Sequence, residues 1–357
     1  MKIAQVMLDP NYGGAQRYFA DLCLELAGRG HSVLSIIRKN SVLEPELVSM
    51  ENIKVVAVNN LFGWYDPFAT NQIKIALNRF QPNIVETHLA RAAFLTGKTK
   101  PAGKWPLITK THGNINGKYY RNMDFIVPTT VQAAKSEYHR NVPQHKFSTV
   151  IPNLARLKPV STVVKPTRIE KIFAAGRFVK KKGFNILLQA LAELKSMDIN
   201  FSLQIAGDGP EFNSLKALST ELGLNENVQF LGRRNDIPDL IKNADLFVLS
   251  SLSDHFPIIV LEAMAMGTPI VATRCEEGHP LDALDEESAI LVDKGEKSAL
   301  FHGLRKAIQD PESCGNRAQN ALTVYKNCYA ADAVVPKILA LYDGVIQQFE
   351  CNNGTRH

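Results

Sequence analysis

The segment EKIFAAGRFVKKKGFNILLQALAEL, residues 170–194, indicates the architecture of the chain. It begins as an apolar strand, EKIFAAG, and passes through a basic loop that ends at Gly183. It continues as a helix whose apolar residues fall at helical spacing on one face, namely Phe184, Leu187, Leu188, Leu191 and Leu194. A strand, a short loop and an amphipathic helix in this order are the first unit of a parallel α/β sheet.

The same pattern opens the first half of the chain. The strand KIAQVML is followed by the loop DPNYGGAQR, a helix ending near Gly28, and a second strand from His31. In the second half, the strand-like runs FSLQIAG, VQFLG, LFVLSS and PIVAT alternate with helical runs at 211–222, 236–243 and 257–266. We therefore expect an α/β protein with two doubly wound, Rossmann-like parallel-sheet domains facing a cleft.

The expected domain boundaries follow from prolines and from a final helical pattern. Three prolines mark a linker near 152–168, and apolar residues at helical spacing predict a last helix over 336–349. The predicted organisation is an N-terminal Rossmann-like domain (1–160), a C-terminal Rossmann-like domain (168–330) and a C-terminal helix (331–350) that crosses back to the first domain.

Composition narrows the class of protein. The 357 residues are 45% hydrophobic and 21% charged, with a mean hydropathy of −0.10. No run approaches the roughly 20 apolar residues of a membrane-spanning helix, and the N-terminus lacks an export-signal pattern. The five cysteines are scattered without metal-ligand spacing. We expect a cytoplasmic protein.

The charge is unevenly distributed along the chain. Residues 1–155 carry a net charge of +8 and the remainder −2. A basic first half fits an anionic partner, such as a phosphorylated acceptor or a membrane surface, and it fits a simple solvated face equally well. Nucleic acid is not expected, because no binding module and no basic stretch interleaved with aromatic residues occurs.

Unusual residues follow the predicted strands of the first half. Gly13 and Gly14 precede a helix and allow close approach of a ligand to the backbone, although a plain tight turn explains them as well. They are not part of a G-x-G-x-x-G dinucleotide fingerprint. His88 and His112 end two strands. A histidine there can accept a proton or bond a sugar hydroxyl, or it can simply cap its strand. His112 is the stronger candidate.

The second half places charged residues at its strand ends. Arg177 and one lysine of the 180–182 run suit a diphosphate, whereas the other lysines are expected to be solvated. Glu262 lies in an apolar helix and needs a partner there, which could be a lysine of the 177–182 loop or a ribose diol. Asp254 precedes this helix and would face the same cleft, where it could contact a transferred sugar. Together these residues indicate a nucleotide-sugar site.

Several segments resemble the retaining glycosyltransferases of family 4, which have the two-domain GT-B fold. The resemblance rests on GGAQRYFADLCLELAGRGHSV, THG, IPN, GRFVKKKGFNILLQAL, AGDGPE, VQFLGRRNDI and DHFPIIVLEAMAMGTPIVAT, and it extends from residue 1 to about 345. It implies that Arg177 and Lys182 hold the donor diphosphate and that Glu262 binds the ribose. The wider donor-binding set that it implies comprises Gly14, Gly207, Arg233, Arg234, Asp254, His255, Phe256 and Ile258.

The resemblance also implies catalytic roles and an acceptor region. His112, Asp254, Arg177 and Lys182 are the implied catalytic residues, and Gly13, His88 and His112 the acceptor side. Two departures from the family pattern concern the donor sugar. The usual Glu-Gly-Phe-Pro is Asp254-His255-Phe256-Pro257 in this chain, and the loop after PIVAT reads CEEGHPLDAL in place of the usual Gly-Gly-x-x-Glu.

The expected function is transfer of a sugar from a UDP- or GDP-linked donor to an acceptor hydroxyl, with retention of configuration. Neither a cofactor nor a metal is expected, since the chain contains no Asp-x-Asp. A nucleotide-sugar epimerase and a catalytically inactive nucleotide-sugar-binding subunit are the alternatives. The acceptor is expected to be a sugar or a lipid-linked molecule of cell-envelope polysaccharide or lipopolysaccharide assembly. Basic residues including Lys98, Lys104, Lys110 and Lys118 would favour the inner, anionic membrane surface.

Overall fold

The described chain divides into two compact units. The computed structural model describes residues 1–10, 13–99, 104–112, 117–131, 134, 149–254, 256–275 and 283–354. Unit 1 comprises Met1–Arg156 and Ala330–His357, and unit 2 comprises Leu157–Tyr329. The C-terminal segment thus belongs to the same unit as the N-terminal half.

Unit 1 is built on a six-stranded sheet in the order β3-β2-β1-β4-β5-β6. All five strand pairs are parallel. The strand order reverses between β1 and β4, so the carboxyl ends of these two strands are where ligands bind in doubly wound sheets. The strands are β1 (Lys2–Met7), β2 (Ser32–Arg38), β3 (Ile53–Val58), β4 (Ile84–His88), β5 (Leu107–Lys110) and β6 (Phe125–Val127).

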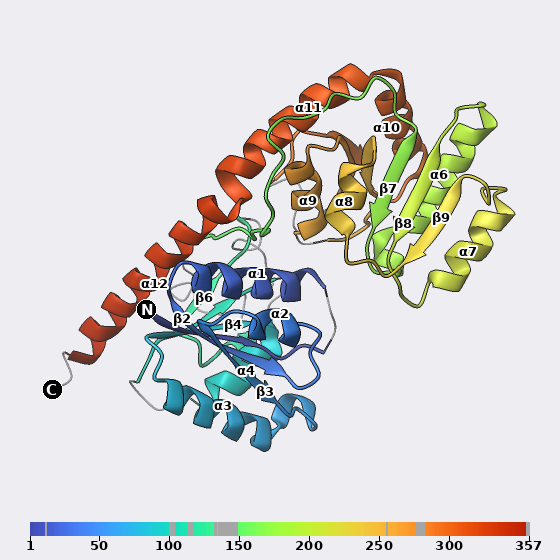
Figure 1. Ribbon diagram of the computed structural model, residues 1–357. Coiled ribbons are helices and arrows are strands. Elements are labelled where there is room, and N and C mark those ends of the chain that lie inside the picture. Colours follow the sequence, from blue (N-terminus) through green and yellow to red (C-terminus); the bar gives the residue numbers. More distant parts are fainter. Residues whose placement is uncertain are drawn as a thin grey trace. The chain divides into compact units, whose positions relative to one another are not determined.

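Helices cover both faces of the unit 1 sheet. In Figure 1, α1 lies on one side of the sheet and α3 on the other. Parallel strands require such crossover helices, which explains why the strands are buried on both faces. The helices are α1 (Gly14–Gly28), α2 (Glu44–Val48), α3 (Pro67–Phe80), α4 (Leu89–Gly97) and α12 (Ala331–Gly354).

The last helix is longer than the sequence pattern predicts. The apolar spacing covers 336–349, whereas α12 begins at Ala331 and contains Pro336. Asp332 lies in its first turn, where a carboxylate favours the positive helix end, and it pairs with Arg29. Helix α12 packs beside α1.

Unit 2 repeats the same topology. Its sheet has the order β12-β11-β10-β7-β8-β9, and all neighbouring strands are parallel. When the strands are numbered from β7 and the sheet is read from β9, the order is the same as in unit 1. The order reverses between β7 and β10. The strands are β7 (Lys171–Ala175), β8 (Ser202–Ala206), β9 (Val228–Gly232), β10 (Leu246–Leu249), β11 (Ile270–Arg274) and β12 (Ile290–Asp293). The predicted α/β, doubly wound fold class is confirmed.

The helices of unit 2 complete the layers around its sheet (Figure 1). They are α6 (Phe184–Ser196), α7 (Phe212–Glu221), α8 (Ile237–Lys242), α9 (Ile258–Met266), α10 (Lys297–Gln309) and α11 (Pro311–Val324). Helix α9 contacts both α8 and α11, which accounts for its apolar residues on every side. It ends at Gly267 in the left-handed region (φ +68°), as the sequence predicts. Within the described ranges, no helix is long and apolar enough to cross a membrane.

Candidate functional site

The loops that follow the strands of unit 2 are bonded to one another along the carboxyl edge of the sheet. The loop after β7 donates from Phe178 N to Asp208 O in the loop after β8 (2.8 Å). The loop after β10 donates from Leu252 N to Lys181 O (2.8 Å) and from the Ser250 hydroxyl to Lys182 O (2.9 Å). These bonds hold the predicted donor loops as one continuous rim.

Two glycines make this close packing of loops possible. A Cβ at Gly183 would lie 2.1 Å from Ser250 O, and one at Gly207 would lie 1.9 Å from Gly176 O. Both residues also have positive φ, +64° and +147°. Gly207 was predicted as a donor-binding residue, and the geometry gives it a packing role because it lets the β7 and β8 loops touch.

Lys182 and Asp254 form an ion pair at the point where the strand order of unit 2 reverses. The Lys182 ammonium donates to Asp254 Oδ2, and each side chain is 15% exposed. Lys182 ends the loop after β7, while Asp254 lies in the loop after β10, the neighbouring strand. Two residues predicted for the same site from segments 72 positions apart are therefore in contact.

The predicted site residues at the start of α9 differ in how deeply they are buried. Phe256 is buried against the ring of Tyr329, with centroids 5.7 Å apart, and Ile258 begins the helix in the core. Glu262 lies one turn further and is half-buried. His255, predicted to bind the donor, lies outside the described residues.

The predicted cations of unit 2 differ in their surroundings. The Arg177 side chain is exposed and has no ion pair within the described parts of the chain. Arg233 and Arg234, in the loop after β9, are also exposed, and Arg234 Nε donates to Asp236 Oδ1 (2.8 Å). Arg177 and Arg233 thus carry solvent-exposed charge, whereas Lys182 is held by Asp254.

Helix ends add positive potential at the same edge. Helices α6 and α9 both begin there, and neither has a side-chain cap or an acidic residue in its first turn. The uncapped N–H groups and the helix dipole of each favour an anion. Among the described residues, no group of three or more His, Cys, Asp and Glu side chains is arranged to hold a metal.

In unit 1, the predicted acceptor residues come together on one side of the sheet. His88 ends β4, and His112 lies two residues beyond β5. His88 Nδ1 and His112 Nε2 are 3.2 Å apart, so the two imidazoles are hydrogen-bonded to each other. Gly13 precedes α1, and Gly14 begins it; Tyr18 of this helix packs its ring against His112 (5.1 Å between centroids).

The histidines lead into a buried polar network that the sequence analysis missed. His88 Nε2 lies 2.7 Å from Gln5 Oε1. The Gln5 amide donates to Glu86 Oε2 (3.1 Å) and to the Tyr342 hydroxyl (2.9 Å), which in turn donates to Glu86. Gln5, Glu86 and His88 are buried, as is Tyr342 of α12.

A signal for this network exists in the sequence. Glu86 interrupts the apolar strand IVETH two residues before His88, and Lys110 interrupts LITK two residues before His112. Alternate residues of a strand point to the same face, so Glu86 shares a face of β4 with His88. A charge within a strand buried on both sides needs partners, by the reasoning applied to Glu262.

The expectation that Lys110 belongs to a basic surface is wrong. Its side chain is fully buried, and its ammonium donates to Ile151 O and to Pro152 O (3.4 Å). Burial lowers the pKa of Lys110 to about 7, against the opposing effect of Glu86. Lys110 therefore anchors the segment around Ile151, within unit 1, to the end of β5, while Lys98, Lys104 and Lys118 are exposed.

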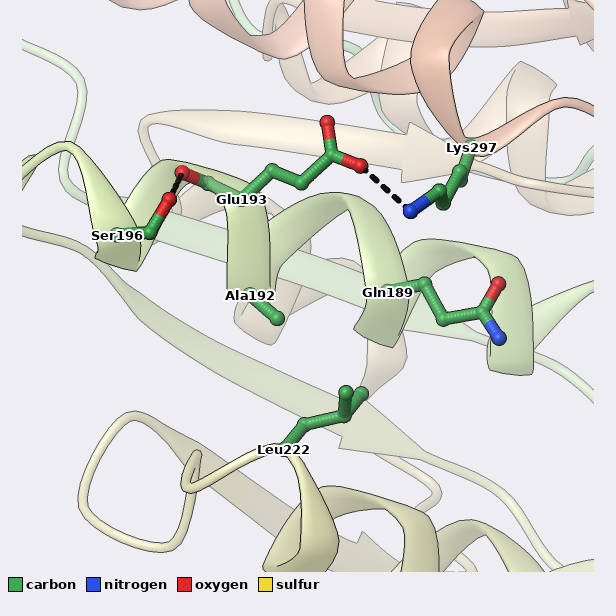
Figure 2. A pocket seen from close by; sticks show the side chains of 6 residues that line it. All are labelled: Gln189, Ala192, Glu193, Ser196, Leu222 and Lys297. Atoms are coloured by element: carbon green, nitrogen blue, oxygen red, sulfur yellow. Dashed lines mark hydrogen bonds and ion pairs between the residues drawn. The ribbon is translucent and has the colours of Figure 1, made fainter.

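A surface hollow of about 440 Å³ lies along α6, away from all of the predicted site residues (Figure 2). Its charged groups, Glu193 and Lys297, pair with each other at 2.9 Å. Its lining residues are Gln189, Ala192, Glu193, Ser196, Leu222 and Lys297. We place no ligand there, because its charges are mutually neutralised.

Comparison with known families identifies the chain. Residues 12–153 match the family described as Glycosyltransferase Family 4, and residues 162–324 match Glycosyl transferases group 1. The chain belongs to glycosyltransferase family 4. Two curated relatives are similar to this glycosyltransferase over nearly its whole length. The lipopolysaccharide core biosynthesis glycosyltransferase LpsE of Rhizobium meliloti is 27% identical over 92% of the chain and 95% of its own. LpsD of the same organism is 25% identical over 93% of the chain and 95% of its own length.

Solved structures confirm the GT-B fold of this glycosyltransferase. A glycosyltransferase from Rickettsia africae superposes with a TM-score of 0.82 at 20% identity, covering 97% of this chain and 98% of that one. HepE from Anabaena, solved in complex with UDP and glucose, superposes with a TM-score of 0.81 at 19% identity, covering 96% and 100%.

Proposed function

We propose that this glycosyltransferase moves a sugar from a UDP- or GDP-linked donor to an acceptor hydroxyl with retention of anomeric configuration. The observation that carries the proposal is the meeting of Lys182 and Asp254 where the strand order reverses, beside the uncapped ends of α6 and α9. A fixed cation and two positive helix ends suit a leaving diphosphate. Carboxylates at the same edge suit hydroxyl groups of the sugar and the ribose.

The parts of the donor can be assigned to named residues under this proposal. Lys182 and the exposed Arg177 would neutralise the diphosphate, and half-buried Glu262 would accept from the ribose diol. Asp254 would contact the transferred sugar. Arg233 and Arg234 would flank the base from the loop after β9, and His112 would contact a sugar hydroxyl. The complex of HepE with UDP and glucose supports UDP as the nucleotide.

The proposed acceptor is a sugar or lipid-linked molecule of cell-envelope polysaccharide or lipopolysaccharide assembly. The names of LpsE and LpsD, both described as lipopolysaccharide core biosynthesis glycosyltransferases, support this choice. The basic first half of the chain, with a net charge of +8, also fits an acceptor that carries phosphate.

A screen of nucleotide-sugars tests the proposed activity. The full-length protein is incubated with UDP- and GDP-linked hexoses, with and without lipopolysaccharide core acceptors, and released nucleotide is measured. We expect release of nucleotide with one donor and a product whose anomeric proton coupling matches that of the donor.

An epimerase would convert the donor sugar without releasing nucleotide. A binding subunit would give a thermal shift with UDP and release nothing. In that case, the double change Asp254→Glu with His255→Gly, which restores the family pattern, tests whether those two residues abolish activity.

We further propose that the enzyme contacts the anionic inner membrane surface through an exposed cluster of one leucine and three aromatic residues. The cluster comprises Leu61 (81% exposed), Phe62 (65%), Tyr65 (71%) and Phe68 (65%), in the segment after β3. Lys98 lies 5.0 Å from the Tyr65 ring. Apolar rings flanked by lysine are suited to the boundary between acyl chains and anionic headgroups.

Vesicle co-sedimentation tests this membrane contact. We expect binding to phosphatidylglycerol-containing vesicles and little to pure phosphatidylcholine. The double variant Phe62→Ser/Phe68→Ser should lose apolar contact, and Lys98→Glu with Lys118→Glu should lose about 1 kcal/mol of attraction for each lysine removed. Val164→Ser, which alters an equally exposed apolar residue of unit 2, is the matched control. Unchanged binding of both double variants would overturn the assignment of this surface.

A further inference from the structure

The buried network of unit 1 determines which nitrogen of His112 carries a proton. Its members come from β1, β4 and α12, and the network ends at His112 beyond β5. Gln5 lies opposite Glu86 in the register of β1 and β4. The hydrogen bonds form a path from Glu86 through Gln5 and His88 to His112, and Tyr342 bonds to both Gln5 and Glu86 at its buried end.

The orientation of the Gln5 amide is fixed by its neighbours. Its nitrogen lies 3.1 Å from Glu86 Oε2 and 2.9 Å from the Tyr342 oxygen. The Tyr342 proton is already donated to Glu86. With Glu86 ionised, a reversed amide would turn its oxygen toward a carboxylate and toward a hydroxyl whose proton is already donated, so the nitrogen occupies this side. The Gln5 oxygen therefore faces His88.

This orientation sets the tautomers of both histidines. The Gln5 oxygen can only accept, so His88 Nε2 must carry a hydrogen and donate to it. In a neutral imidazole the other nitrogen is then an acceptor, so His88 Nδ1 accepts from His112 Nε2. His112 thus holds its hydrogen on Nε2 and an open lone pair on Nδ1. That Nδ1 is buried and has no hydrogen-bond partner among the described residues.

Packing keeps both rings neutral and in place. Burial lowers the pKa of His112 to about 3 and that of His88 well below its usual value, with the charge of Lys110 acting in the same direction. Tyr18 packs edge-on against His112, and Phe19 against His88 with centroids 5.3 Å apart. Both aromatic residues belong to α1, so rotation of either imidazole is opposed by this helix.

We propose that Gln5 and Glu86 are positioning residues that hold His112 as the Nε2–H tautomer, reserving its Nδ1 lone pair for a hydroxyl of a bound sugar. The use of that lone pair rests on the proposed function, whereas the tautomer itself does not. His112 then accepts a hydrogen bond from the sugar and cannot donate one. A helix from the end of the chain takes part in the arrangement, because Tyr342 belongs to α12.

Nuclear magnetic resonance of ¹⁵N-histidine-labelled full-length protein tests the tautomer directly. Two-bond proton–nitrogen correlations distinguish protonated from unprotonated ring nitrogens, and His88→Gln and His112→Gln variants assign the signals. Without any donor, we expect His112 and His88 both to carry hydrogen on Nε2. A hydrogen on His112 Nδ1 in the unmodified protein would overturn the proposal.

Variants test whether the network imposes this state. Gln5→Met removes the acceptor for His88 Nε2 with little change in volume, and we expect an Nδ1–H population of His112 to emerge. We expect kcat/KM for the donor to fall about 10-fold or more, as when outer partners of a functional histidine are lost. Tyr342→Phe leaves the bond from Gln5 to Glu86 and should keep the tautomer.

Thr87→Val is the matched control. Thr87 is buried between Glu86 and His88 on the same strand and donates to Ile108 O (3.3 Å), but it is outside the network. This variant should lose a hydrogen bond and keep both tautomers. An unchanged His112 spectrum in Gln5→Met would overturn the positioning role. If the tautomers are as expected but no nucleotide-sugar releases its nucleotide, the proposed function fails and the network assignment stands.

Discussion

Replacing Lys182 by alanine is expected to lower kcat for sugar transfer by about 100- to 1,000-fold, or about 2.7–4 kcal/mol of transition-state stabilisation. Lys182 is the cation that the structure holds where the strand order of unit 2 reverses, with only 15% of its side chain exposed. Negative charge develops on the leaving diphosphate, and a fixed ammonium in a partly dehydrated site stabilises it without rearrangement. KM for the donor should change less than kcat.

The neighbouring lysine provides a matched control. Lys181 lies in the same turn, and its side chain is exposed. Lys181→Ala removes the same charge from the same loop but not the ion pair, and we expect less than a twofold change in kcat. Steady-state kinetics and urea unfolding of both variants should be compared. Equal losses would mean that the loop acts through its total charge, and a wild-type rate for Lys182→Ala would refute the assigned role.

The fold, and the position of most candidate residues at the strand ends, could be predicted from the sequence because local patterns determine them. Strand, glycine-bearing loop and helix recur in both halves, and this recurrence is sufficient to predict two doubly wound sheets. The carboxyl ends of parallel strands then share one edge, so residues such as His88 and His112 could be placed together before their contact was known.

The pairing of side chains could not be obtained in the same way. From the sequence, Glu262 could pair with a lysine of the 177–182 loop or bind a ribose diol, and the structure pairs Lys182 of that loop with Asp254. Which carboxylate reaches the ammonium depends on how the loops after β7 and β10 pack, and the close approach of Gly183 to Ser250 O decides this. The role of Tyr342 cannot be predicted from helical spacing, because its hydroxyl donates to Glu86 in a strand 256 residues away.

Replacing Asp254, the ion-pair partner of Lys182, by asparagine is expected to strengthen UDP binding and to lower kcat. Asp254→Asn removes a negative charge from the proposed diphosphate site and frees the ammonium of Lys182. We expect UDP to bind more tightly by about 1 kcal/mol, about fivefold in Kd, as measured by isothermal titration calorimetry. If Asp254 also contacts the transferred sugar, as proposed, kcat should fall by at least 10-fold in the same variant.

Two comparisons separate this effect from a general change in charge. Asp208→Asn makes the same change at an exposed carboxylate in the adjacent β8 loop, which bonds locally to Gly209 N (2.7 Å), and it should leave UDP affinity nearly unchanged. In a Lys182→Ala background, Asp254→Asn should improve UDP binding less than it does alone, because part of its effect is exerted through the freed ammonium. Weaker UDP binding by Asp254→Asn would instead mean that the carboxylate orients Lys182 toward the diphosphate rather than competing for it.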